Sequence, residues 1–271
     1  MKVHRKLQSF GGTKMLKFVI AFISISFGSA ASGGGDGWRV MGGAEAELGE
    51  FPWVTSIQWG SLGHWCGGAI YDGSHVITAA QCCLYRRPEE LTVWAGVVDL
   101  ENPAEGSTSP VTEIIVHEDF NLQELTNDIC ILVLGTQLQF GTNIGSIVLP
   151  QQGVEYQKGT PVQVSGWGLT REGDLPPTLL STADIVTYTQ DECEEFYGPT
   201  LPVYDHMICA GQDGGGRGFC DGDEGGPLVR SDGSKELVGI VSWSHGCARP
   251  SYHGVYTQVS YFVDWILSNV A

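Results

Sequence analysis

The chain has 271 residues, of which 42% are hydrophobic, enough to bury the core of one all-β domain. It carries 14 basic and 31 acidic residues, a formal net charge of −17. Five basic residues precede residue 18 and no acidic residue precedes Asp36, so the chain after residue 30 has a net charge of 9 − 31 = −22. Such a negative surface argues against nucleic acid and anionic membranes as partners.

The amino-terminal segment has the pattern of a signal peptide. A basic stretch precedes an apolar run over residues 16–27, and small residues follow, with a cleavage site near Ala30. Met15 offers an alternative start with a more compact signal. The run is too short to span a bilayer, and no later segment has about 20 uninterrupted apolar residues. We therefore expect a signal peptide over residues 1–30 and a secreted, extracellular protein with no membrane anchor.

The rest of the chain has a residue pattern that is typical of a β protein. Residues 31–39 form a short glycine-rich lead, and residues 40–271 form one domain without an internal repeat. Short apolar runs, separated by glycine- and proline-rich breaks, occur at residues 92–96, 111–116, 129–134, 161–165 and 237–243. This pattern favours a β-barrel or sandwich over alternating βαβ units. The apolar spacing of residues 261–267 predicts a short terminal helix.

Eight cysteines all lie after residue 39. An even number in a secreted chain predicts four disulfides, although the sequence alone leaves their pairing open. There is no Cys-x-x-Cys pair and no His-Glu-x-x-His motif, so we expect neither a metal site nor a cofactor.

Short motifs follow one another in a fixed order at residues 39–43, 51–53, 65–68, 78–82, 127–132, 165–168, 207–211, 222–227, 241–243 and 254–257. Together they resemble the chymotrypsin and trypsin family of serine proteases. The wording of residues 246–250 and 261–266 looks most like arthropod gut trypsins. This resemblance implies an all-β fold of two packed six-stranded antiparallel β-barrels, with a short C-terminal helix and an active cleft between the barrels.

Two of the three catalytic residues of that family are replaced. The family's Thr-Ala-Ala-His-Cys reads Thr-Ala-Ala-Gln-Cys here, and its Gly-Asp-Ser-Gly-Gly-Pro reads Gly-Asp-Glu-Gly-Gly-Pro. The triad positions are therefore Gln81, Asp128 and Glu224, and no catalytic set is intact. Glutamine has no titratable group to act as a base, and a glutamate carboxylate is a poor acyl-transfer nucleophile. Losing both functions costs roughly a factor of a million in turnover.

Other parts of the site are retained. The backbone amides of Gly222 and Glu224 match the oxyanion hole, and Ser242 matches a residue that hydrogen-bonds the triad aspartate. We expect the Gln81 amide to replace the lost imidazole as a donor to Asp128. We also hypothesise that the Glu224 carboxylate folds into its own oxyanion hole; the alternative is a glutamate exposed in the cleft.

The resemblance also implies a zymogen. Cleavage after Arg39 would free the ammonium of Val40, which would pair with Asp223 and order the surrounding loops; residues 31–39 would then be a short activation peptide. The alternative is an inherited site that is no longer used.

The specificity pocket departs from that of trypsin. The position of the basal aspartate is Gly218, and its neighbour is Phe219, whose ring we expect to enter the pocket. Ser244 replaces a glycine, and Val97 replaces the first acidic ligand of the family's calcium loop, so calcium is not expected. The remaining pocket positions are Ser242 and Gly254.

The resemblance pairs Cys66 with Cys82, Cys193 with Cys209, and Cys220 with Cys247. Cys83 and Cys130 remain, and they lie two residues after Gln81 and Asp128, so they are either bonded or free buried thiols. His245 and His253 are expected near the cleft rim, in surface or structural roles.

Three functions remain open for this sequence. The first is a non-proteolytic binding protein, a monomer acting as cofactor, decoy or regulator for extracellular proteins, including proteases or their substrates. The second is a serine endopeptidase with unconventional residual activity, and the third is a stable secreted protein without a specific partner.

Overall fold

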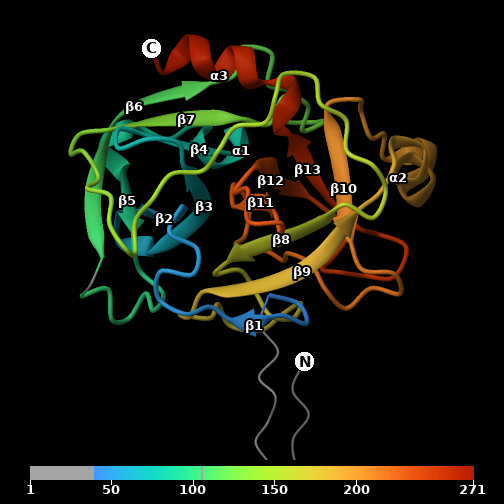
Figure 1. Ribbon diagram of the computed structural model, residues 1–271, viewed down its shortest axis with the longest axis horizontal. Coiled ribbons are helices and arrows are strands. Elements are labelled where there is room, and N and C mark those ends of the chain that lie inside the picture. Colours follow the sequence, from blue (N-terminus) through green and yellow to red (C-terminus); the bar gives the residue numbers. More distant parts are fainter. Residues whose placement is uncertain (1–39, 105) are drawn as a thin grey trace, which may run out of the picture. The chain divides into compact units, whose positions relative to one another are not determined.

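The computed structural model describes residues 40–104 and 106–271 (Figure 1). The predicted signal peptide, the predicted activation peptide and Arg39 lie outside the described residues. Within the described residues, no helix is long and apolar enough to cross a membrane.

Six antiparallel strands close the first barrel in the order β2-β3-β4-β7-β6-β5. Its interior is a continuous apolar cluster that includes Ile57, Ile77 and Ile131, each with 1% exposure or less. The strands are β2 (Val54–Trp59), β3 (His64–Ile70), β4 (His75–Thr78), β5 (Leu91–Ala95), β6 (Ser107–Val116) and β7 (Cys130–Leu134).

The second barrel also has six strands, in the order β9-β10-β13-β12-β11-β8, and the pairing of β8 with β9 closes it. The short strand β1 (Ala44–Glu45) adds to the outside of β9. Figure 1 shows the two barrels side by side, as the resemblance implied. The strands are β8 (Pro161–Gly166), β9 (Ser181–Thr187), β10 (Met207–Gly211), β11 (Pro227–Arg230), β12 (Leu237–Trp243) and β13 (Gly254–Gln258).

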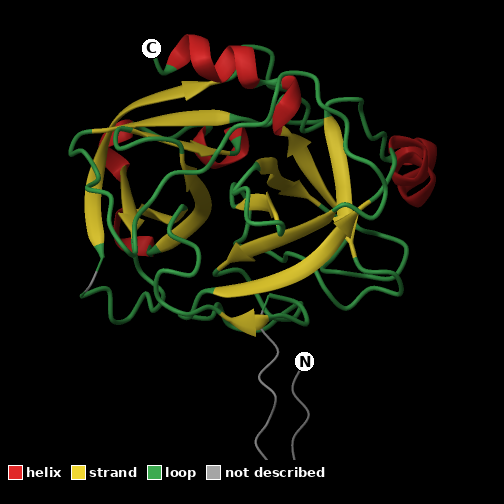
Figure 2. Cartoon of the chain, viewed as in Figure 1, coloured by secondary structure: helices red, strands yellow, loops and turns green. Residues whose placement is uncertain are grey.

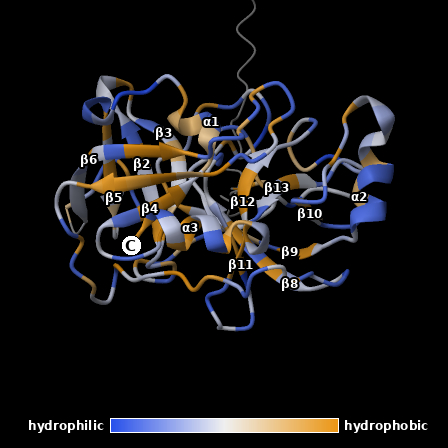
Figure 3. Ribbon diagram, turned by 90° about the horizontal axis from the view of Figure 1, so that it is seen from above, coloured by the Kyte–Doolittle hydropathy of each residue, from blue (hydrophilic) through white to orange (hydrophobic). Residues whose placement is uncertain are grey.

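Helices are few and short (Figure 2). They are α1 (Ala80–Cys83), α2 (Gln190–Tyr197) and α3 (Val263–Asn269), with 3-10 turns η1 (Gly60–Leu62), η2 (Pro88–Glu90), η3 (Gly198–Thr200) and η4 (Val259–Tyr261). Figure 3 shows α2 as a largely hydrophilic helix at the edge of the second barrel.

The terminal helix begins at Val263, two residues later than predicted, because residues 259–261 form a 3-10 turn and Phe262 leaves the helical region at φ −115°. Ile266 of α3 is fully buried in the core cluster of the first barrel. The Trp265 indole donates to a carboxylate oxygen of Glu118 at 2.9 Å, so the end of the chain is bound to the first barrel.

The four disulfides join the predicted partners: Cys66–Cys82, Cys83–Cys130, Cys193–Cys209 and Cys220–Cys247. No described cysteine is free. The Cys83–Cys130 bond ties α1 to the start of β7, and so links the elements that carry Gln81 and Asp128.

Replacing both Cys83 and Cys130 by alanine should lower the free energy of unfolding by about 4 kcal/mol, because the bond closes a span of 47 residues. It should also speed hydrogen exchange at the Gln81 amide, which donates to Asp128. Urea denaturation and hydrogen exchange measure the two effects. Removing Cys193 and Cys209 is the control, and it should destabilise the chain without speeding exchange at Gln81.

Candidate active-site cleft

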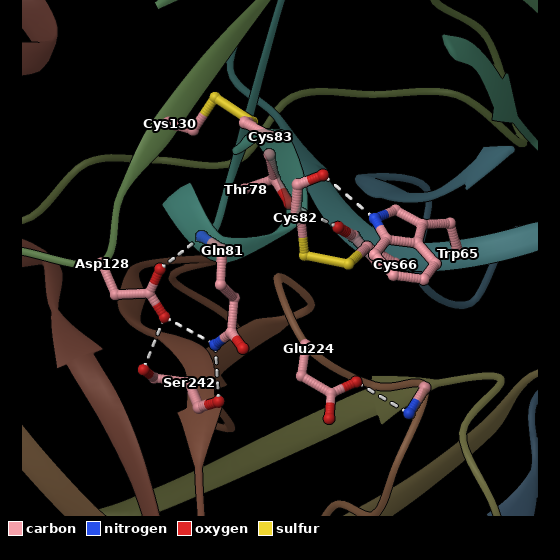
Figure 4. Close-up of a disulfide and its surroundings, with 12 residues drawn as sticks. Trp65, Cys66, Thr78, Gln81, Cys82, Cys83, Asp128, Cys130, Glu224 and Ser242 are labelled. Atoms are coloured by element: carbon pink, nitrogen blue, oxygen red, sulfur yellow. Dashed lines mark hydrogen bonds between the residues drawn. A yellow bond between two sulfur atoms is a disulfide. The ribbon is translucent and has the colours of Figure 1, made fainter. Parts of the chain in front are cut away.

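The triad positions come from three separate segments that meet between the barrels (Figure 4). Gln81 lies in α1, Asp128 lies just before β7, and Glu224 lies in the loop between β10 and β11. A cleft of about 450 Å³ opens at Gln81 and Glu224, and its other lining residues are Trp65, Cys66, Cys82, Asp221 and Gly222.

Asp128 is fully buried and its carboxylate has three well-placed donors. The Gln81 backbone amide donates to Oδ1 at 2.9 Å, while Gln81 Nε2 and Ser242 Oγ donate to Oδ2 at 2.7 and 2.6 Å. Burial raises the pKa of Asp128, and these hydrogen bonds oppose that shift. The Gln81 amide therefore replaces the lost imidazole as a donor, as predicted.

The second hydrogen of Gln81 Nε2 also forms a hydrogen bond, since this nitrogen donates to the Ser242 carbonyl at 2.8 Å. Among the described contacts, Gln81 forms no hydrogen bond with Glu224. The pairing of a base with a nucleophile, on which the chemistry of the family depends, is thus absent from the cleft.

The Glu224 carboxylate turns back onto its own loop. The Gly222 amide donates to Glu224 Oε2 at 2.7 Å, and the Glu224 amide also favours the ionised carboxylate (Figure 4). Burial raises the pKa of Glu224 in spite of these two amides. A carboxylate oxygen of Glu224 therefore lies at an amide that the resemblance assigns to the oxyanion hole, which is the geometry that the hypothesis of a self-occupied oxyanion hole requires.

His64, which the sequence analysis overlooked, supports the oxyanion loop from below. Its Nε2 lies 2.9 Å from the Gly222 carbonyl oxygen, and its Nδ1 lies 2.6 Å from Ser56 Oγ. Since a carbonyl only accepts, Nε2 carries the proton and Nδ1 accepts from the serine. Burial lowers the pKa of His64, which favours this neutral form. The one available signal was its place directly before the motif of residues 65–68.

Asp223 is fully buried and pairs with no cation among the described residues. Its carboxylate accepts from the Gly168 amide at 2.7 Å and the Cys220 amide at 3.0 Å. Burial raises the pKa of Asp223 to about 7. A Cβ at Gly168 would lie 2.4 Å from this carboxylate, so only glycine fits there. Val40 is fully buried in an apolar cluster of the second barrel.

Phe219 packs against Gly254, one of the positions that the resemblance assigns to the specificity pocket. Its ring is 4% exposed and packs edge-on against Tyr256, with centroids 5.2 Å apart. A Cβ at Gly254 would lie 2.4 Å from the same ring. Gly218, at φ 154°, carries no charge to select a basic side chain, and Ser244 Oγ donates within its own loop to the Gly246 carbonyl at 2.6 Å.

No described residue set favours a metal. Val97, at the first calcium position, is 7% exposed and packs closely on Gly106. The one group with metal-like spacing among the described residues is Cys220, Asp221 and Cys247, and its two sulfurs are joined in a disulfide.

The two histidines expected near the cleft rim differ in burial. His253 is 5% exposed and stacks on Tyr188, with centroids 4.1 Å apart, so it has the structural role that was one of its two predicted roles. The apolar surroundings of α2 cover it, and burial lowers its pKa. His245 is exposed, 4.7 Å from the Tyr252 ring.

Two closed barrels with a cleft between them, together with an oxyanion loop and a triad-type aspartate, define the trypsin-like class of proteins. The Trypsin family model matches residues 40–266, and the chain belongs to this family. It is 44% identical over 238 residues to Trypsin-1 of Astacus astacus, an alignment that covers 85% of this chain and 99% of the relative. It is 35% identical over 232 residues to the vitellin-degrading protease of Bombyx mori, covering 86% of each chain.

The raised pKa of Asp223 makes the stability of the uncleaved chain depend on pH. Its value in the folded chain, about 7, lies above the ordinary 3.8, so the folded chain binds a proton that the unfolded chain releases between these values. This contribution is fully present below about pH 4 and is lost as the pH rises through about 7.

In Asp223→Asn, urea denaturation at several pH values should show a shallower fall in stability from about pH 4 to 7 than in the unsubstituted chain. Equal slopes for the two chains would show that Asp223 does not titrate in this range.

Proposed function

We propose that this chain is a secreted, non-proteolytic member of the trypsin family that acts by binding other proteins. One observation carries the proposal: Gln81 at the base position is fully engaged with Asp128 and Ser242, while Glu224 at the nucleophile position is held on the Gly222 amide. The protein would act as a cofactor, decoy or regulator in an extracellular protease cascade.

Reaction chemistry supports this reading. Acyl transfer needs a nucleophile, a base to take its proton, and an empty oxyanion hole. Here the amide of Gln81 has no basic nitrogen, and the Glu224 carboxylate takes up a donor that the transition state would need. Restoring only the base at residue 81, or only the nucleophile at residue 224, leaves the other function missing.

The alternative is a serine-type endopeptidase with residual activity. The relatives favour it, since one is named as a trypsin and another as a vitellin-degrading protease. The intact barrels and the open cleft of about 450 Å³ are compatible with either function.

Back-substitution separates the two candidates. The chain cleaved after Arg39 should not hydrolyse a peptide library, whereas Gln81→His combined with Glu224→Ser should restore hydrolysis. Because the Phe219 ring packs against Gly254, the library must contain small side chains before the scissile bond. Each single variant serves as a control and should stay inactive. Hydrolysis by the unsubstituted chain, abolished by Glu224→Ala, would instead support the endopeptidase.

We further propose that cleavage after Arg39 still changes the shape of the protein. The buried, unpaired Asp223 carboxylate would gain the Val40 ammonium, an ion pair that would order the adjoining loops. Comparing hydrogen exchange before and after cleavage should show new protection around residues 215–224. In Asp223→Ala this difference should vanish. A difference that persists in this variant would contradict the switch.

A further inference from the structure

A stacked arginine beside the cleft has no acidic partner. The Arg86 guanidinium carbon lies 3.8 Å from the centroid of the Trp59 ring and 4.5 Å from that of Trp65. The two indoles meet edge-on, with centroids 5.1 Å apart. Two aromatic faces therefore hold one planar cation in a fixed orientation, an arrangement open to arginine and poorly suited to lysine.

Arg86 forms no ion pair in a chain with 31 acidic residues, although its charge is near enough to Glu90 to help lower the pKa of that carboxyl. Among the described residues, Arg86 is the one partly buried cation without a carboxylate within ion-pair distance; Arg87, Arg230 and Arg249 each have one. Its Nε is buried without an acceptor, whereas the two terminal nitrogens are neither buried nor hydrogen-bonded. The terminal donors of the guanidinium are thus available to a ligand.

This cation adjoins the candidate cleft through a shared side chain. Trp65, one of the two stacking rings, lines the cleft together with Gln81 and Glu224. Its Nε1 donates to the Cys82 carbonyl at 3.0 Å, which fixes the ring beside the Cys66–Cys82 disulfide (Figure 4). Tyr85, next to Arg86 in the chain, is 84% exposed at φ +60°. A chain lying in the cleft and continuing past Trp65 would meet a cation flanked by aromatic surface.

We propose that Arg86, held between Trp59 and Trp65, is a recognition site for an acidic side chain of an extended polypeptide partner that lies in the cleft. A carboxylate matches the guanidinium fork with two parallel hydrogen bonds. An internal Asp or Glu fits better than a chain end, because the cleft beside Trp65 leaves room for the partner's chain to continue.

The charge of the whole protein makes this site selective. With a net charge of −22 after residue 30, the surface repels acidic segments in general, so a carboxylate is favoured only where a free cation is offered. The inference rests on the proposed function, since it names the chemistry of the partner that the inactive cleft would hold.

The test titrates the full chain with a blocked pentapeptide, acetyl-Ala-Gly-Glu-Gly-Ala-amide, and observes the arginine Nε and tryptophan indole resonances by NMR. The same peptide with Gln in place of Glu is the neutral probe. A third peptide carries Gln at the centre and a free terminal carboxylate. We expect the Glu peptide to shift the Arg86, Trp59 and Trp65 signals and to bind about tenfold more tightly than the Gln peptide.

Arg86→Gln should remove this preference, and Arg86→Lys should reduce it, since a lysine keeps the charge and loses the planar fork. Arg171→Gln is the matched control, because Arg171 is exposed and its removal changes the net charge equally; the preference should persist. Equal binding of the Glu and Gln peptides, equal losses in Arg86→Gln and Arg171→Gln, or tighter binding of the free terminal carboxylate would overturn the proposal. Peptide hydrolysis does not depend on Arg86, so such a failure would leave the proposed function standing.

Discussion

The buried carboxylate of Asp128 is the constraint around which the centre of the molecule is arranged. A carboxyl group with no exposure to water needs hydrogen-bond partners, and its neighbours supply them from both barrels. Gln81 donates from α1 of the first barrel and Ser242 from β12 of the second. In an active protease an imidazole would fill the place of Gln81 and also serve as a base. Gln81 still donates a hydrogen bond to Asp128, but it cannot act as a base.

Two further carboxylates are under the same constraint. Asp128 and Asp223 are fully buried and Glu224 is partly buried. Burial raises the pKa of all three, and each accepts backbone or side-chain hydrogen bonds. The amides of Gly222 and Glu224, which serve a transition state in active relatives of the family, here serve the Glu224 side chain. His64 also hydrogen-bonds this loop, at the Gly222 carbonyl.

Features carried by local motifs were predictable from the sequence. The two barrels, three of the four disulfides, the donation from Gln81 to Asp128 and the packing of the Phe219 ring all follow from matched positions. The Cys83–Cys130 bond was one of two outcomes that the sequence left open. Features that depend on contacts between several distant segments could not be predicted. The burial of His253 depends on the packing of α2, and the stacking of Arg86 depends on two tryptophans from β2 and β3. A histidine or arginine has no sequence pattern that reports such surroundings.

The central claim is that Glu224 closes its own oxyanion hole, and a crystal structure of the chain cleaved after Arg39 tests it most directly. The account predicts a carboxylate oxygen of Glu224 about 3 Å from the Gly222 amide nitrogen, with Gln81 still bonded to Asp128. A Glu224 side chain turned to solvent, with its oxygens more than about 4 Å from that amide, would contradict it.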